Sequence, residues 1–274
     1  MNRLGIEMLT LLGMPPVEHV RLAAELGCVS ISTGLTGLPL TMFGLPELGI
    51  YPQWSLETDQ LLRREMKAAL RDTGVHIGLG EGFRVRTDGD VRDRGAGLDI
   101  MAELGAVRIN AVSMEPAMAR TYDQLGVLAD MVIERGMLFT IEFAPPNAIN
   151  SLEGALAAVE HVGHGRCRIL FDAMHFFRSG GTVAALQALD PALIGYAQLC
   201  DAPMESAGGT YMAEAMFARM VPGEGELPLR DFIAALPTDC EIGLEVPILA
   251  NLQAGISPRD HAARAVAAAR ALGA

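Results

Sequence analysis

Lysine is almost absent from this sequence. Lys67 alone occurs, in a segment whose apolar residues recur at helical spacing. An aldolase that forms a Schiff base needs a lysine on a barrel strand, so this absence disfavours that chemistry. The four cysteines form no CxxC pair, and each lies at or beside an end of an apolar run: Cys28, Cys167, Cys200 and Cys240. We therefore predict reduced core thiols, in preference to disulfides or a zinc site.

Long hydrophobic runs and basic clusters are also absent. No stretch reaches the roughly 18 uncharged apolar residues of a membrane span, and the amino terminus lacks a signal-type core and a small-residue cleavage site. The 21 basic and 33 acidic residues give a formal net charge of −12. Such a charge repels phosphate backbones and anionic lipid surfaces. We expect a cytoplasmic protein that has neither nucleic acid nor membrane as a partner.

Eight short β-type runs alternate with longer amphipathic segments that end in glycine. Half of the 274 residues are hydrophobic, which is enough for a large core. The runs are 4–12, 28–33, 75–80, 107–113, 138–143, 167–172, 194–201 and 241–246. Eight such units favour a closed parallel barrel, and no GxGxxG follows the first run as a Rossmann fold would require. The sequence predicts an α/β protein, a single (β/α)8 TIM barrel over residues 1–274.

Two connections are longer than a barrel needs. They follow the second and seventh runs, at 34–54 and 202–225. Both leave carboxyl ends of strands, where barrel active sites are built, so both are candidate lids. The apolar character of the first, LPLTMFGLPELGIY, fits a homodimer contact equally well.

Side chains with metal-binding oxygens lie at or near the ends of four successive runs, the fifth to the eighth. They are Glu142 in TIEFAPP, Asp172 in LFDAMH, Gln198 in YAQLCD and Glu245 in GLEVP. Singly, each residue is more often a helix cap, an exposed loop residue or a buried amide bonded to backbone. Together they would crowd one barrel mouth, where unpaired carboxylates are costly. Their coincidence predicts a cation.

These motifs resemble the xylose-isomerase-like barrel superfamily, whose members are often described as sugar phosphate isomerases or epimerases. The matching residues are Glu142 in IEFAPP, the step from Asp172 to His175 followed by RSGG, Gln198 in QLCDA, the segment RMVPGEGELPL, and Glu245 in LEVP. The resemblance is strongest from the fifth run to the eighth and looser over the rest of the chain. Each motif is weak alone, and the set is specific.

The resemblance implies that Glu142, Asp172, Gln198 and Glu245 hold one divalent metal. This all-oxygen set suits Mn²⁺ best, with Mg²⁺ or Co²⁺ as alternatives, and suits zinc less well. The matching histidine in the superfamily, here His175, contacts substrate and polarises a carbonyl or hydroxyl. Arg219, before VPGEG, is similar to an arginine that contacts substrate in relatives, although a solvated loop arginine is the plain alternative.

The function implied is a metal-dependent isomerase or epimerase of a small polyhydroxylated, sugar-like carbonyl compound. Glu142 and Glu245 would act as base and acid through a metal-bound enediolate. The alternative is a dehydratase (lyase) of a 3-dehydroshikimate-like or inosose-like substrate. Ketose 3-epimerases carry a glutamate where this chain has Ala148, and the dehydratases tend to carry a histidine where it has Ala144. Gln198 followed by LCDA is closer to hydroxypyruvate isomerases and to those dehydratases.

Two other classes are disfavoured. The superfamily includes nucleases of the endonuclease IV type, which would use several zinc ions bound by many histidines and a basic surface. This chain has six histidines, mostly away from strand ends, and a net charge of −12. A non-catalytic barrel that keeps a metal only for stability remains open, although His175 and Arg219 beside the predicted ligands argue against it.

Overall fold

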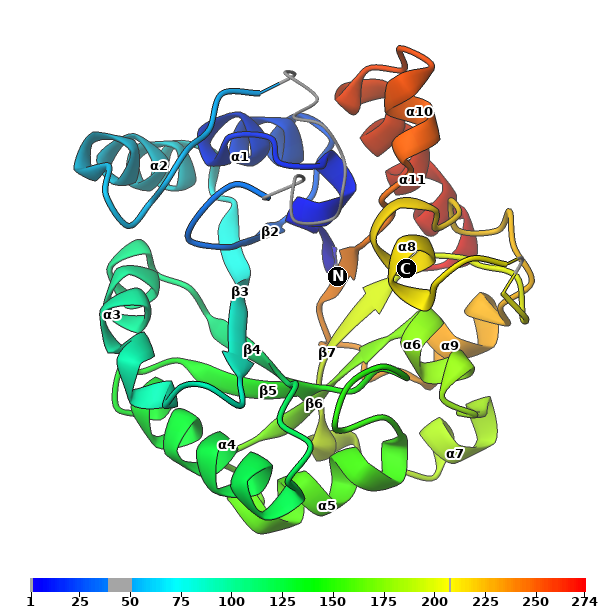
Figure 1. Cartoon of the computed structure of the whole chain (residues 1–274). Helices are drawn as coiled ribbons and strands as arrows, with labels where there is room; N and C mark the ends of the chain where they lie inside the picture. Colours follow the sequence, from blue (N-terminus) through cyan, green and yellow to red (C-terminus); the bar gives the residue numbers. More distant parts are fainter. Residues whose placement is uncertain (1, 39–50, 207) are drawn as a thin grey trace.

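Eight parallel strands close into one barrel in the order of the sequence, β1 to β8 (Figure 1). The computed structural model describes residues 2–38, 51–206 and 208–274. The strands are β1 (Leu4–Ile6), β2 (Ser30–Thr33), β3 (His76–Val85), β4 (Arg108–Ser113), β5 (Leu138–Glu142), β6 (Arg168–Asp172), β7 (Ile194–Leu199) and β8 (Ile242–Leu244). Pairing of Gly5 with Gly243 joins β1 to β8 and closes the barrel.

The helices surround the strands (Figure 1). They are α1 (Pro16–Glu25), α2 (Gln60–Thr73), α3 (Gly95–Leu104), α4 (Met118–Ile133), α5 (Leu152–Val162), α6 (Ala173–Arg178), α7 (Val183–Gln187), α8 (Tyr211–Phe217), α9 (Leu229–Ala235), α10 (Leu249–Gln253) and α11 (Pro258–Leu272). Local sequence fixes their ends: the Asp59 side chain accepts the backbone N–H groups of Leu61 and Leu62 at the start of α2, each at 2.9 Å. Gly74 ends that helix at φ 75°, which glycine adopts readily.

The predicted barrel is confirmed, with two clear differences in the strands. The third run was expected to end at residue 80, but β3 continues to Val85 and so contains Glu81. The first run, 4–12, was expected to be a single strand, but β1 ends at Ile6 and a 3-10 helix spans Met8–Leu11. The backbone N–H of Met8 donates to Ser32 Oγ at 2.8 Å, so the chain leaves the sheet at this point. A short apolar run does not by itself distinguish a strand from a buried helical turn.

The buried apolar side chains form two separate clusters. The larger lies between the strands and the helices, and a small cluster of Leu79, Leu170 and Tyr196 is separate from it. Leu170 and Tyr196 lie two residues before Asp172 and Gln198, and therefore on the same, inner face of their strands. This cluster fills the barrel beneath the candidate site.

All four cysteines are buried free thiols, as predicted. Within the described part of the chain, no helix combines the length and the apolar character needed to cross a membrane.

Candidate active site

The four predicted metal ligands lie at one end of the barrel. Glu142 and Asp172 are the last residues of β5 and β6, Gln198 is the last but one of β7, and Glu245 follows β8. Because all eight strands are parallel, these positions share the carboxyl-terminal mouth. The fold thus delivers the residues to the common mouth that the sequence predicted.

Arg219 joins two of these residues. Its Nη2 lies 2.8 Å from Glu245 Oε2, and its Nη1 makes a close ion pair with Asp172 Oδ2. The Arg219 side chain is 2% exposed and that of Asp172 is fully buried. The pKa of Asp172 is lowered, since the attraction of Arg219 and the bonds it accepts outweigh its burial. A buried guanidinium therefore holds two of the expected ligands together.

The seventh loop is built to hold Arg219 in place. Asp201 and Met220 exchange backbone hydrogen bonds of 2.9 and 2.8 Å across the loop. The Asp201 carboxylate also accepts the backbone N–H groups of Gly223, at 2.8 Å, and of Leu227, at 3.1 Å. Arg219, next to Met220, donates through Nε to the Ala215 carbonyl at 2.8 Å. The described residues of this candidate lid are therefore tied to the site by backbone and side-chain hydrogen bonds.

His175 occupies the first turn of α6, where Asp172 is the N-cap residue. The Asp172 side chain accepts the backbone N–H of His175 at 2.8 Å. The imidazole Nε2 lies 3.5 Å from Glu142 Oε1, and Nδ1 lies 2.6 Å from the phenol oxygen of Tyr211. Burial lowers the pKa of His175 to about 4, so the ring is neutral at physiological pH. A neutral imidazole offers one donor and one acceptor.

Glu142 faces His175 and is held by a neighbouring strand. Asn110 on β4 donates through Nδ2 to Glu142 Oε2 at 2.6 Å. Burial raises the pKa of Glu142 to about 8, and repulsion from Asp172 adds to the shift. Proximity to the operating pH is the property expected of a group that takes up and returns protons.

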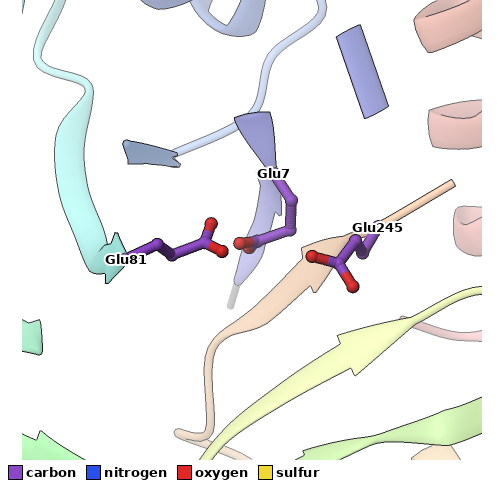
Figure 2. A group of neighbouring side chains, drawn as sticks. All are labelled: Glu7, Glu81 and Glu245. Carbon is purple, nitrogen blue, oxygen red and sulfur yellow. The ribbon is translucent and has the colours of Figure 1, made fainter. Parts of the chain in front are cut away.

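Three glutamates from the other side of the barrel meet at the same mouth. Oxygen atoms of Glu7, Glu81 and Glu245 all lie within 4.8 Å of one another, and Figure 2 shows these carboxyl groups turned toward each other. Tyr196 donates its hydroxyl to Glu7 Oε1 at 2.7 Å. Burial, followed by repulsion from neighbouring carboxylates, raises the pKa of Glu7 to about 7 and that of Glu81 to about 8.

Gln198 connects this group to the predicted set. Its Nε2 lies 3.3 Å from Glu7 Oε2 and 3.3 Å from Glu245 Oε1. Its Oε1 is buried without a hydrogen-bond partner among the described residues, and so is Glu81 Oε1. Buried oxygens of this kind are costly unless a donor or a cation satisfies them.

The residues present fit a divalent cation. Five carboxyl groups gather at the mouth, and among the described residues Arg219 is the cation paired with two of them. The donors are carboxylate and amide oxygens, which hard divalent ions prefer, and two of these oxygens have no other partner. Among the described residues, the carboxyl oxygens that meet within 4.8 Å belong to Glu7, Glu81 and Glu245, so this group shares only Glu245 with the predicted ligands.

The sequence interpretation missed several members of this site. Glu7 and Glu81 each interrupt or directly follow an apolar run, the same signal that identified Glu142 and Glu245. Tyr211 and Asn110 carry no such signal, because a tyrosine at the start of a helix and an asparagine within a strand are common in any protein.

The first long connection contributes little that can be described. Residues 39–50, which include most of the expected lid or homodimer contact, lie outside the described residues. Trp54, at its end, donates through Nε1 to the Gly13 carbonyl at 3.1 Å and is partly buried, as a packing residue would be.

Comparisons with known proteins agree with this architecture. A family model described as "Xylose isomerase-like TIM barrel" matches residues 20–272. A search of curated proteins found no match. One similar solved structure is a fusion of a xylose isomerase-like TIM barrel with 4-hydroxyphenylpyruvate dioxygenase, of which this chain covers 38% (89% of this chain, 20% identity, TM-score 0.69).

Three further structures match over nearly their whole length. The IolI protein with a binding zinc atom has 16% identity and a TM-score of 0.78 (98% of this chain, 97% of that one). D-Psicose 3-epimerase from Clostridium cellulolyticum H10 has 14% identity and a TM-score of 0.71 (98% of each). The probable 3-DHS dehydratase AsbF from Bacillus anthracis has 14% identity and a TM-score of 0.68 (95% and 97%). Identities this low show a shared fold alone.

Proposed function

Because the chain belongs to the xylose isomerase-like TIM barrel family, we propose that it is a divalent-metal-dependent isomerase or epimerase of a small polyhydroxylated carbonyl compound. The observation that carries the proposal is the meeting of Glu142, Glu245, His175 and Arg219 at the carboxyl-terminal mouth. At this mouth, two carboxyl groups that can transfer protons lie beside a neutral imidazole and a guanidinium. The imidazole and the guanidinium can bind substrate oxygens.

The cation would be held by Glu142, Asp172, Gln198 and Glu245. When bound, such an ion polarises a carbonyl oxygen and makes the neighbouring C–H group more acidic. We propose Mn²⁺, with Mg²⁺ or Co²⁺ as substitutes, because the donors are oxygens. The zinc named for the IolI structure supports a divalent ion in this fold.

Glu142 and Glu245 are the proposed base and acid. Proton removal requires the carboxylate form. Burial raises the pKa of Glu142 to about 8 in the metal-free protein, and a cation bound beside it would favour the carboxylate. Glu245, which directly follows β8, returns the proton at the neighbouring carbon or on the other face. Return of the proton to the neighbouring carbon gives isomerisation, and return to the other face of the same carbon gives epimerisation.

His175 and Arg219 bind and orient the substrate. When the Tyr211 hydroxyl donates to Nδ1 of His175, the ring proton lies on Nε2, which faces Glu142 and can donate to a substrate oxygen. Arg219, pinned by the seventh loop, adds a charged donor beside Glu245.

Dehydration of a 3-dehydroshikimate-like or inosose-like compound is the second candidate. It starts with the same proton removal and ends with loss of a β-hydroxyl group. One observation favours it: Ala148 stands where the ketose 3-epimerases carry a second glutamate.

The test is exchange of substrate α-protons with deuterated solvent, followed by NMR on a panel of hydroxy-carbonyl compounds with added Mn²⁺. Glu142→Gln and Glu245→Gln should each fold but lower the exchange rate by about a hundredfold or more. Glu224→Gln, at an exposed glutamate of the seventh loop, is the matched control and should exchange normally. Undiminished exchange in both site variants would reject the assignment.

A further inference from the structure

A cavity of about 360 Å³ opens at the other end of the barrel. Its lining includes Arg108, Leu138 and Arg168, the first residues of β4, β5 and β6, and the turns that precede β5 and β6. First residues of parallel strands lie at the amino-terminal mouth, opposite Glu142 and Asp172 at the far ends of β5 and β6. The volume is in the range of sites for small organic molecules.

Three arginines line this cavity in a chain of net charge −12: Arg108, Arg166 and Arg168. Arg166 is committed to an ion pair with Asp130. Arg168 is exposed, and its side chain has no hydrogen-bond or ion-pair partner in the part of the chain that the structure describes. A guanidinium without a carboxylate partner, on the wall of a cavity in an acidic protein, is available to an anion.

Arg108 adds donor capacity from within the barrel wall. The residue is 7% exposed, and its Nη1 donates to Glu241 Oε2 at 2.7 Å and to the Gly78 carbonyl at 3.1 Å. Its guanidinium carbon lies 5.0 Å from the centre of the Tyr196 ring, which fixes its position. Its Nε is buried without an acceptor among the described residues, and no described residue accepts from Nη2. Unused donors of this kind favour an added acceptor.

The remaining wall is apolar and partly open. Leu138 and Ile133 line the cavity and are 46% and 41% exposed, among the most exposed large hydrophobic side chains of the described chain. Gly195 lets the strands pack closely beside Arg168, because a Cβ there would stand 2.6 Å from Thr140 Cγ2 and 2.7 Å from Arg168 Cβ. The charged donors of the cavity therefore lie beside exposed apolar surface.

We infer that this cavity binds a small organic anion. Its phosphate or carboxylate group accepts hydrogen bonds from Arg168 and Arg108, and its apolar body covers Leu138 and Ile133. Phosphate and carboxylate are the groups that guanidinium recognises through paired N–H donors. The site lies at the opposite mouth of the barrel from the proposed catalytic residues and is separate from them.

Calorimetric titration with phenyl phosphate, benzoate and inorganic phosphate tests this inference, with a chelator present so that binding does not depend on the proposed metal. We expect phenyl phosphate or benzoate to bind, and inorganic phosphate to bind more weakly because it lacks the apolar body. Arg168→Gln should weaken binding by about tenfold or more. Arg64→Gln, at an exposed arginine of α2 outside the cavity, makes the same charge change and should bind normally.

Hydrogen exchange locates the bound anion, since Arg219 at the opposite mouth is a second cationic group. Protection on binding is expected at 133–140 and 165–168, and Leu138→Ser should remove the advantage of phenyl phosphate over inorganic phosphate. Absence of binding by every probe, equal binding in wild type and Arg168→Gln, or protection confined to the neighbourhood of Arg219 would overturn the inference.

Discussion

The phenol oxygen of Tyr211 lies 2.6 Å from Nδ1 of His175. Burial lowers the pKa of His175 to about 4, so the ring is neutral. One ring nitrogen then carries a proton, and the other can accept a hydrogen bond. With Tyr211 as donor, the proton lies on Nε2, 3.5 Å from Glu142 Oε1. In that arrangement a residue of α8 would set the tautomer of a residue of α6 and direct its N–H group toward Glu142.

Tyr211→Phe removes this hydrogen bond and leaves the ring in place. We expect proton exchange on substrate to slow by about tenfold, with a loss of folding free energy of about 1 kcal/mol. Nitrogen NMR of the imidazole should show a mixture of tautomers. Tyr122→Phe is the control, because Tyr122 stacks on His161 outside the site. An unchanged tautomer in Tyr211→Phe would contradict the assignment.

Arg219→Met tests the electrostatic role of the buried guanidinium. The change leaves Asp172 and Glu245 buried without their shared partner, which should cost about 3–5 kcal/mol in the absence of metal. Urea unfolding with a chelator measures the loss. Arg264→Met breaks an ion pair with Glu224 whose side chains are 54% and 40% exposed, and should cost less than about 1 kcal/mol. Similar losses in the two variants would show that Arg219 is not a buried neutralising group.

The raised pKa values at the mouth predict an unusual dependence of stability on pH. In the unfolded chain, the carboxyl groups of Glu7, Glu81 and Glu142 have a pKa near 4.5. In the folded protein their pKa values are raised to about 7, 8 and 8. Between these limits the folded state binds more protons, so the free energy of unfolding of the metal-free protein falls as pH rises. The stabilisation is complete below 4.5 and is lost by about pH 8.

Urea unfolding between about pH 5 and about pH 8, with a chelator, measures this slope. Glu81→Gln should flatten it, because an amide does not ionise, whereas Glu224→Gln at an exposed position should leave it unchanged. A stability that instead rises over this interval would contradict the raised pKa values.

Two variants separate the overlapping sets of metal ligands. If Glu142, Asp172, Gln198 and Glu245 hold the ion, Asp172→Asn should weaken Mn²⁺ binding by at least about tenfold while Glu81→Gln changes it by less than about twofold. Calorimetry measures the affinity, and circular dichroism confirms folding. If Glu81→Gln instead weakens Mn²⁺ binding more than Asp172→Asn does, the ion lies between Glu7, Glu81 and Glu245.

The site was only partly predictable from the sequence. Glu142, Asp172 and Glu245 were found because acidic residues at the ends of apolar runs are unusual, and the fold places them at one mouth. Glu7 and Glu81 carry the same signal. Glu7 was overlooked within a run interpreted as one long strand, and Glu81 follows directly after another run. Tyr211 and Asn110 act through contacts with distant residues, which local sequence does not contain.

The sequence by itself determined the alternation of eight strands with helices, the closed parallel order, and the end of the barrel at which the acidic residues gather. These features follow from the periodicity of apolar residues, which is local along the chain. Tertiary structure alone decided that Arg219 bridges Asp172 and Glu245, that Gln198 lies between two clusters, and that arginines line the opposite mouth. Such pairings depend on how loops and strand registers bring side chains to within a few ångströms, a property of the whole fold.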